Sequence, residues 1–438
     1  MQLPAHIRYC IDTLEQAGYE AFAVGGCVRD WLLGIEPHDY DLCTAATPET
    51  VAALFSHRTL VTAGMKHGTV GVVFPEGVVE ITTYRTEGGY TDGRHPDWVK
   101  FVPTIEEDLS RRDFTVNAMA WSPKSGLVDP FGGESDLKSH TLRAVGNPDV
   151  RFQEDPLRIL RGVRFSVRFG LAPESETDSA MLRQAGLMEV LARERVFDEL
   201  CKLLPLISSS ELVRFAPILT QPIPELASAI GFDQRSPHHA YDLFTHVAHV
   251  TAAVPADVTL RWAALLHDVG KVPSFTTDEN GRGHFYGHAK VGAQIADGIL
   301  RRLKAPTALR EQVVKLIDLH MTRLEPERKL LRRRLSRLGS DTVDQLLLLQ
   351  EADMGSKGTG REEEMGIFPE IRKILQEIYE ENACLNIKDL AINGQDLMTI
   401  GYTPGKALGD CLNRLLEQVV DESLPNDRAA LLEAAKLS

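Results

Sequence analysis

The stretch that decides the fold of this chain is Val24–Leu42, VGGCVRDWLLGIEPHDYDL. The apolar run that begins at Ala21 predicts a strand, and Cys27–Leu33 predicts a short helix that a glycine ends. Gly25 and Gly26 therefore lie where a strand turns into a helix. Such a turn presents backbone N–H groups and a helix N-terminus, which together bind phosphate groups.

Two acidic residues, Asp39 and Asp41, close this stretch. In an extended chain alternate side chains share a face, so both carboxylates point the same way. They repel each other unless a cation lies between them, and hard oxygen ligands suit Mg²⁺ bound together with substrate phosphates. Arg29, in the first turn of the predicted helix, has a guanidinium free to grip phosphate oxygens. A glycine pair or an acidic pair alone is typical of an ordinary loop, but their succession around Arg29 favours metal-dependent nucleotidyl transfer.

Composition narrows the class of protein. A chain of 438 residues is too long for one core, so we expect roughly two to four domains. No apolar run approaches membrane-spanning length, no signal pattern opens the chain, and six scattered cysteines indicate reduced thiols, so we expect a cytoplasmic protein without a membrane partner. The net charge of −14 opposes general nucleic-acid binding, although binding depends on local charge. The basic run Arg328–Arg337, taken alone, predicts a solvated helix face.

The next segments predict a strand pair and a loop. His67–Phe74 and Val78–Tyr84 read as strands joined by a tight turn. Glu80, on the second strand, either adds a third carboxylate near Asp39 and Asp41 or faces outward as an ordinary strand residue. The glycine-rich, charged segment from Arg85 to Val102 predicts a long exposed loop.

Two arginine-rich segments follow. In the first, Arg111, Arg112 and Asp113 precede an apolar run, Phe114–Ala120, that predicts a helix. Charged side chains beside a buried helix need partners, which a nucleotide phosphate would supply.

The second segment, Glu154–Phe169, also predicts a helix. It carries arginines in steps of three: Arg158, Arg161 and Arg164. Asp155 lies three residues before Arg158, so we expect the two to share a helix face. That pair would either read a base edge through hydrogen bonds or form part of a salt-bridged structural helix.

Taken in order, these motifs resemble those of class II tRNA nucleotidyltransferases and bacterial poly(A) polymerases, in the DNA polymerase β-like superfamily. The motifs are VGGCVRDWLLG with DYD, RRDFTVNAMA, DPFGG and EDPLRILRGVRF, and RVFDELCKLL at Arg195–Leu204 resembles the last of the set. They cover roughly the first half of the chain.

The resemblance implies that Asp39 and Asp41 hold catalytic Mg²⁺ ions. Glu80, from its place on the predicted strand, is a further catalytic candidate. The nucleotide-binding candidates are Gly25, Gly26, Arg29, Arg112, Asp155, Arg158, Arg161 and Arg164. Of these, Asp155 and Arg158 would read the base of CTP or ATP, and Arg161 and Arg164 would support them. Family members that add only CC have a shortened loop between the acidic pair (DYD here) and the RRDFT motif. Here Arg85–Arg94 is intact, which argues against that class.

The second half of the chain carries a different motif. An adjacent His267 and Asp268 lie in LRWAALLHDVGK, with further His and Asp residues at a distance, a pattern that suits a divalent metal held by helices. Residues 236–357 resemble the HD superfamily of metal-dependent phosphohydrolases. By that likeness, the ligands of a second divalent cation would be His246, His267, Asp268, His320 and Asp353. His288 is a sixth candidate, and the identity of the metal stays open.

We therefore expect an α+β protein: a polymerase β-like nucleotidyltransferase head with a small mixed sheet, followed by mostly α-helical neck, HD and tail domains. The expected bounds are 1–145 for the head, 146–235 for the neck, 236–360 for the HD domain and 361–438 for the tail. The tail resembles the part of the tRNA enzymes that grips the tRNA body, and it equally fits a helix–turn–helix packing unit.

The expected activity is template-independent addition of CCA, or of its terminal A, to the 3′ end of tRNA from CTP and ATP by a two-metal mechanism. Poly(A) polymerase is the nearest alternative. An HD-type phosphohydrolase acting on RNA ends or nucleotides, with a head that only binds nucleotide, is an alternative of another class. A non-catalytic RNA-binding protein is disfavoured, because binding alone needs no pair of carboxylates.

Overall fold

The structure is a computed structural model of the chain. It describes all residues except 89–97, 237–239, 359–361 and 437–438. The chain forms two compact units: one comprises residues 1–207 and 214–227, and the other comprises residues 208–213 and 228–438. The finer division into four domains stays a prediction.

The first unit contains a seven-stranded mixed sheet with strand order β3-β4-β5-β2-β1-β8-β9. The strands are β1 (Ala21–Val24), β2 (Asp41–Thr44), β3 (Leu60–Val61), β4 (Thr69–Phe74), β5 (Gly77–Thr83), β8 (Ala120–Ser122) and β9 (Gly126–Val128). Strands β2 and β5 run parallel, and the other neighbouring strands are antiparallel. The predicted mixed sheet is confirmed, and the fully buried β1 lies between β2 and β8.

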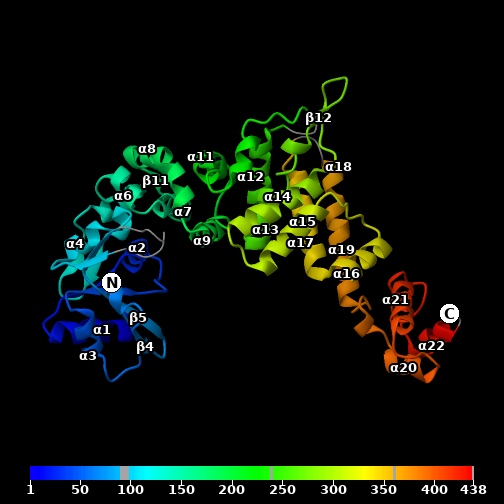
Figure 1. Ribbon diagram of the computed structural model, residues 1–438, viewed down its shortest axis with the longest axis horizontal. Helices are drawn as coiled ribbons and strands as arrows, with labels where there is room; N and C mark the ends of the chain where they lie inside the picture. Colours follow the sequence, from blue (N-terminus) through cyan, green and yellow to red (C-terminus); the bar gives the residue numbers. More distant parts are fainter. Residues whose placement is uncertain (89–97, 237–239, 359–361, 437–438) are drawn as a thin grey trace. The chain divides into compact units, whose positions relative to one another are not determined.

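Helices pack around this sheet, and further helices follow it along the chain in the same unit (Figure 1). They are α1 (Ala5–Gln16), α2 (Gly26–Leu32), α3 (Pro48–Leu54), α4 (Ile105–Ser110), α5 (Gly133–Lys138), α6 (Pro148–Glu154), α7 (Leu157–Phe169), α8 (Ser175–Gln184), α9 (Arg193–Leu203) and α11 (Ala216–Leu219). One apolar cluster joins β1 to α4 through Phe22, Tyr84 and Leu109. Because this core ties the strand before the glycine turn to α4, it fixes that turn relative to the arginines that follow α4.

Two predicted segments differ from the structure. The expected loop Arg85–Val102 contains a two-stranded ribbon, β6 (Arg85–Gly88) paired with β7 (Trp98–Phe101). Most of the segment used to argue against CC-only addition, from residue 89 on, lies outside the described residues. The expected helix Phe114–Ala120 is wrong as well: it is a 3₁₀ turn, Thr115–Asn117, that leads straight into β8. Ala120 pairs with Val24 in the sheet, so the chain there is extended.

The second unit is largely helical. Its helices are α12 (Leu243–Ala253), α13 (Val258–Leu266), α14 (His288–Arg302), α15 (Thr307–Leu319), α16 (Arg328–Leu338), α17 (Ser340–Gly355), α18 (Glu362–Met365), α19 (Ile367–Glu380), α20 (Gly394–Thr399), α21 (Lys406–Val420) and α22 (Arg428–Lys436). Helices α12, α13, α15 and α17 pack on one another and lie side by side in Figure 1. No helix among the described residues has the length and apolarity that crossing a bilayer requires.

The basic run on α16 is only in part the solvated helix face expected from its sequence, because Lys329, Arg333 and Arg337 are exposed but Arg332 is not. Arg332 is buried and donates hydrogen bonds to the backbone oxygens of Val420 (2.9 Å) and Val419 (3.0 Å), at the end of α21. Arg333 forms a two-point ion pair with Asp421 (2.6 and 2.5 Å). The run therefore holds the C-terminal helices against α16.

Candidate active site

The glycine turn lies at the end of β1, as predicted. Gly25 has a φ of +70°, a left-handed conformation that favours glycine, and its N–H donates to the Met119 oxygen at 3.0 Å. A side chain at this position would also meet the Arg112 guanidinium, 2.6 Å from the place of its Cβ. Glycine thus permits an arginine from another segment to lie directly on the turn.

The predicted acidic residues gather beside this turn. Asp41 is the first residue of β2 and pairs with Val24 of β1, and Glu80 occupies the corresponding place on the parallel neighbour β5, one residue before the Leu42–Ile81 pair. Asp39, Asp41 and Glu80 line one hollow of about 410 Å³, which we call the acidic hollow. All three side chains are exposed there.

The Asp41 carboxyl is electrostatically crowded although the residue is exposed. Desolvation raises its pKa above the ordinary value, Arg112 opposes the rise, and Asp39 adds to it. A cation placed between the two carboxylates would reverse that rise. The donor set in the acidic hollow therefore fits a hard divalent cation.

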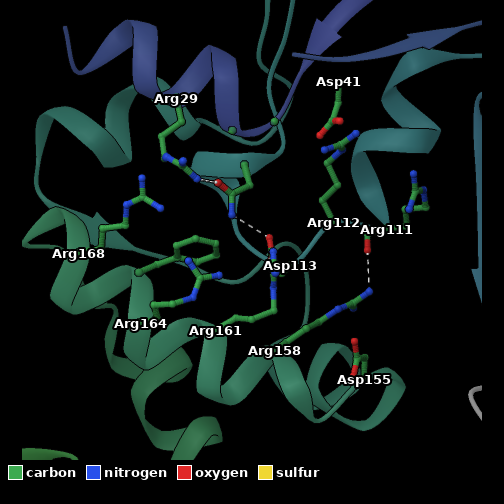
Figure 2. A pocket seen from close by; sticks show the side chains of 14 residues that line it. Arg29, Asp41, Arg111, Arg112, Asp113, Asp155, Arg158, Arg161, Arg164 and Arg168 are labelled. Atoms are coloured by element: carbon green, nitrogen blue, oxygen red, sulfur yellow. Dashed lines mark hydrogen bonds and ion pairs between the residues drawn. The ribbon is translucent and has the colours of Figure 1, made fainter. Parts of the chain in front are cut away.

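Asp41 also lines a second hollow, the arginine cavity, of about 420 Å³ (Figure 2). The cavity is lined by Gly25, Gly26, Arg29, Asp41, Arg111, Arg112, Asp113, Asn117, Asp155, Arg158, Arg161, Arg164, Phe165 and Arg168. All the predicted nucleotide-binding residues are among them. In Figure 2 the arginines of α7 rise from one helix face, and Arg112 extends toward Asp41. Their binding roles stay predictions.

Arg29 is not free, contrary to the sequence-based expectation. It is 5% exposed, and its Nη1 donates to Asn117 Oδ1 at 2.5 Å. Its Nε and Nη2 donate to Asp30 Oδ1 at 2.9 and 2.6 Å, and its guanidinium lies 4.2 Å from the centre of the Phe169 ring. Arg29 is thus held in one orientation at the cavity wall.

The partners expected from a nucleotide for Arg111 and Arg112 are supplied in part by the protein. Asp108, which is fully buried, accepts from Arg111 Nε at 3.0 Å and from Arg112 Nη2 at 3.5 Å. It also accepts from the backbone N–H of Arg85 at 3.1 Å. Burial alone would raise the pKa of Asp108, but the two guanidinium groups lower it overall. Asp108 therefore stays ionised and orients both arginines.

The expected helix pair of Asp155 and Arg158 is wrong. Pro156 separates α6 from α7, so Asp155 precedes the second helix instead of sharing a face with Arg158. Asp155 accepts from Arg195 Nη2 at 2.9 Å, whereas Arg158 donates to Glu154 at 2.8 Å. Both residues still line the arginine cavity.

Two residues that sequence reasoning did not propose as site residues connect the arginines. Asp113 accepts from Arg161 Nε at 2.8 Å and from Asn117 Nδ2 at 3.0 Å, while the other end of the Asn117 amide accepts from Arg29. The four-residue spacing of Asp113 and Asn117 in RDFTVN was the available signal. Arg164, by contrast, pairs with Glu199 on α9 at 2.6 Å.

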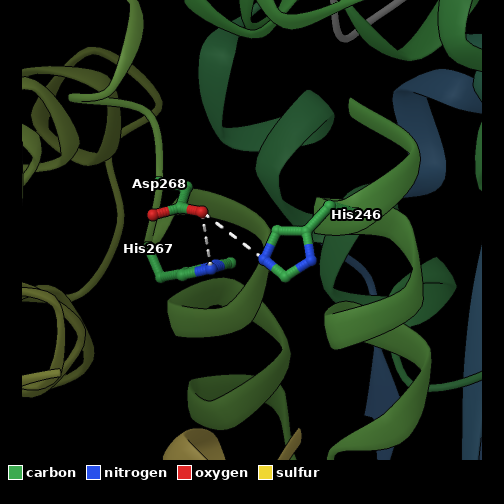
Figure 3. A group of neighbouring side chains, drawn as sticks. All are labelled: His246, His267 and Asp268. Carbon is green, nitrogen blue, oxygen red and sulfur yellow. Dashed lines mark ion pairs between the residues drawn. The ribbon is translucent and has the colours of Figure 1, made fainter. Parts of the chain in front are cut away.

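In the second unit, the predicted metal ligands come together from different elements. His246 lies on α12, His267 and Asp268 follow α13, His320 follows α15, and Asp353 lies on α17. The Nε2 atoms of His246 and His267 lie 3.5 and 3.1 Å from Asp268 Oδ2 (Figure 3). His246 Nε2 is also 3.1 Å from Asp353 Oδ1. The sixth candidate, His288, starts α14 and joins the same cluster.

The rings of this cluster are oriented by backbone carbonyls. Nδ1 of His267, His288 and His320 lies 2.7, 2.8 and 2.6 Å from the oxygens of Ala264, Phe285 and Ile317. In each case a carbonyl three residues earlier accepts the Nδ1–H, which leaves Nε2 as a lone-pair donor. Burial lowers the pKa of His320 to about 4, so this ring is neutral at pH 7. Such rings fit a divalent metal.

Comparison with known proteins places the chain in a family. Residues 21–143 match the family model described as the Poly A polymerase head domain, and residues 275–435 match the model described as tRNA nucleotidyltransferase domain 2 putative. Neither description names an HD domain, so that resemblance stays a prediction.

Curated relatives match along almost the whole chain. The CCA-adding enzyme of Latilactobacillus sakei subsp. sakei (strain 23K) is 35% identical over 428 residues, 97% of this chain and 96% of the relative. That of Levilactobacillus brevis (strain ATCC 367) is 35% identical over 431 residues, 98% of this chain and 96% of the relative. The crystal structure of the Bacillus stearothermophilus CCA-adding enzyme in complex with CTP matches with a TM-score of 0.70 at 26% identity, and the match covers 100% of this chain and 98% of that one. The chain belongs to the CCA-adding enzymes, a family of tRNA nucleotidyltransferases.

Proposed function

We propose that this enzyme adds the complete CCA sequence to the 3′ end of tRNA from CTP and ATP, without a nucleic-acid template. The relatives that match along the whole chain are named for the addition of all three nucleotides. The arginine cavity offers guanidinium groups to a triphosphate, and the acidic hollow adjoins it. A tRNA substrate implies that the enzyme works in the cytoplasm.

The observation that carries this proposal is the position of Asp41, which lines both hollows. We assign Asp39 and Asp41 as the residues that hold Mg²⁺, with Glu80 as a third carboxylate. When bound, Mg²⁺ would activate the RNA 3′-hydroxyl and neutralise charge on the leaving pyrophosphate, by a two-metal mechanism. The role of this chain's own residues is to hold the triphosphate: Arg112 faces the glycine turn and Asp41 together.

The nucleobase would be read from the other side of the arginine cavity. Asp155 offers acceptor oxygens and Arg158 offers donors, which are the groups that discriminate the hydrogen-bonding edges of cytosine and adenine. Arg161 and Arg164 support them from the same face of α7. Protein side chains that read the base make a template unnecessary.

The test is incubation of the enzyme with tRNA that lacks CCA, CA or A, in the presence of each labelled nucleotide. Complete CCA addition predicts that all three acceptors are extended to the same mature end. Extension of only the CC-ended tRNA would instead indicate A-addition. Long A tails on unrelated RNA would indicate a poly(A) polymerase.

We also propose a second activity, hydrolysis of phosphate esters by the second unit as in HD-type enzymes. It rests on the convergence of His246, His267, Asp268, His320 and Asp353, with ring nitrogens oriented by backbone carbonyls. The test is phosphate release from 2′,3′-cyclic and 3′-phosphate nucleotides with Ni²⁺, Mn²⁺ or Mg²⁺. If a metal-loaded protein releases none with any of the three, this unit is a scaffold without hydrolytic activity.

A further inference from the structure

Arg168 is the one arginine of the arginine cavity that no carboxylate neutralises in the part of the chain that the structure describes. It lies in the last turn of α7, and its side chain is exposed at the cavity wall. A guanidinium in this state offers its donors to a ligand. The other arginines of the cavity each form an ion pair with an acidic side chain; they are Arg29, Arg111, Arg112, Arg158, Arg161 and Arg164.

Arg168 lies far along α7 from the residues proposed to read the base. Arg158 and Arg168 are ten positions apart on this helix, which is a distance of about 15 Å along the helix axis. Arg168 follows Arg161 by seven residues, so these two lie on the same helix face, two turns apart. An extended nucleoside triphosphate spans a comparable distance from its base to its terminal phosphate.

Arg29 lies at the same end of the cavity. The guanidinium carbons of Arg29 and Arg168 lie 4.2 and 5.1 Å from the centre of one ring, that of Phe169. In Figure 2 the Arg168 side chain extends on the side of the cavity where Arg29 lies, away from Asp155. Burial lowers the pKa of Arg29, Asp30 opposes that effect, and the positive charge of Arg168 lowers the pKa further. Asp30 pairs with Arg29 alone, so this end of the cavity attracts an anion.

The order of the groups in a nucleotide indicates which anion this is. Attack on the α-phosphorus requires the α-phosphate beside Asp41, which would hold Mg²⁺. The base extends from there toward Asp155 and Arg158, so the β- and γ-phosphates lie on the other side, toward Arg29 and Arg168. The terminal phosphate carries the largest negative charge of the three, and the fork of an arginine can bind two of its oxygens.

We propose that Arg168 binds the terminal phosphate of the incoming CTP or ATP and thereby makes the enzyme select a triphosphate over a diphosphate. This inference rests on the proposed function and adds a specificity-determining residue to it. Arg168 lies outside the three-residue series of Arg158, Arg161 and Arg164, so the sequence pattern did not indicate it. A phosphate of the RNA backbone has the same chemistry, and the test separates the two sources.

The test measures equilibrium binding of CTP and of CDP, in Mg²⁺ and without tRNA, to the full chain and to Arg168→Gln. The variant should bind CTP about tenfold more weakly and CDP with unchanged affinity, because CDP has no γ-phosphate. Arg168→Lys keeps the positive charge and should restore part of the CTP affinity. The matched control is Arg183→Gln, since Arg183 is an exposed arginine of the same unit that pairs with Asp149 outside the cavity, and it should bind both nucleotides as the parent does.

Equal affinity of the parent for CTP and CDP, equal weakening of both in Arg168→Gln, or weakening of neither would overturn the proposal. Unchanged CTP binding together with a raised KM for tRNA would assign Arg168 to the RNA backbone instead. The proposed function is tested separately, by incorporation from labelled CTP and ATP into tRNA that lacks CCA. A parent that incorporates neither would refute that function, whereas the comparison of CTP with CDP needs no tRNA and still decides the role of Arg168.

Discussion

Arg195 on α9 donates from Nη2 to Asp155 Oδ2 at 2.9 Å, across forty residues of sequence. The other carboxylate oxygen, Oδ1, accepts from the backbone N–H of Leu157 at 3.1 Å. Asp155 is therefore oriented by α9 and by the start of α7. The proposed reading of the nucleobase by Asp155 depends on this orientation.

We expect Arg195→Ala to lower the selectivity between CTP and ATP nearly as much as Asp155→Ala does. The ratio of the two kcat/KM values should change by about tenfold. The physical reason is that a carboxylate without its ion pair rotates away from the base edge. Single-nucleotide incorporation with each triphosphate measures the ratio. Arg193→Ala is the matched control, because Arg193 is on the same helix and donates to the Glu189 backbone oxygen. Unchanged selectivity in Arg195→Ala would refute the orienting role.

Asp39→Ala and Asp41→Ala should each reduce nucleotide incorporation by more than about a hundredfold, because even loss of outer partners of metal ligands costs up to that factor. Both side chains are exposed, so thermal unfolding should change little. Glu76→Ala is the control, since Glu76 is an exposed carboxylate of the same acidic hollow. Appreciable turnover in either aspartate variant, or an equal loss in Glu76→Ala, contradicts the assignment.

Asp113 should make the first unit sensitive to acid. Burial alone would raise the pKa of Asp113, but Arg161 and the Asn117 hydrogen bond lower it from 3.8 to about 2. A group with a lowered folded-state pKa stabilises the fold above its unfolded value and loses that contribution as the pH falls through its folded value. The stabilisation is on the order of 2 kcal/mol at neutral pH and disappears between about pH 4 and pH 2.

Denaturant unfolding of Asp113→Asn and of the parent protein, at pH 7 and near pH 2.5, tests this. The parent should be more stable than Asp113→Asn at pH 7, and this difference in unfolding free energy should shrink near pH 2.5, because the unfolded chain has taken up the Asp113 proton there while the folded protein has largely not. Asp198→Asn, on the exposed side of α9, is the control. If the difference in unfolding free energy between the parent and Asp113→Asn does not change with pH, the charge of Asp113 contributes nothing and only its packing matters.

Arg332→Ala should loosen the C-terminal helices from α16. The buried guanidinium satisfies the backbone oxygens of Val419 and Val420, and their loss leaves carbonyls at the end of α21 without partners. Hydrogen exchange in α21 should accelerate by about tenfold, which corresponds to roughly 1.4 kcal/mol of local stability. Arg337→Ala, at an exposed position of the same helix, should leave exchange unchanged. If hydrogen exchange in α21 is equally slow in both variants, contacts other than those of Arg332 keep α21 on α16.

Local patterns were sufficient to predict the strand, the glycine turn and the acidic pair at the start of the site. A four-residue apolar strand, a glycine turn and an alternating acidic pair each depend on neighbours in sequence, and β1, Gly25 and Asp41 lie as those patterns indicate. The expected nucleotide-binding residues all line one cavity because their segments meet around the glycine turn.

Partners distant in sequence could not be predicted in this way. One partner of Arg29, Asn117, lies eighty-eight residues further along the chain, whereas its other partner, Asp30, is the next residue and was a signal that the sequence did offer. Asp155 was assigned to Arg158 from a spacing that holds only within one helix, and Pro156 breaks that helix. The Phe114–Ala120 error has the same origin, since pairing of Ala120 with Val24 overrides local helix preference.

Apart from Arg168, the arginines that we propose to face a triphosphate are already engaged in ion pairs. The pairs are Arg29–Asp30, Arg111–Asp108, Arg158–Glu154, Arg161–Asp113 and Arg164–Glu199. An entering ligand must therefore compete with carboxylates for each of these guanidinium groups, and the competition favours the ligand with the greatest negative charge. Products with shorter phosphate chains would be held less tightly than the nucleotide that replaces them, so the same ion pairs that shape the pocket would also help to empty it after each addition.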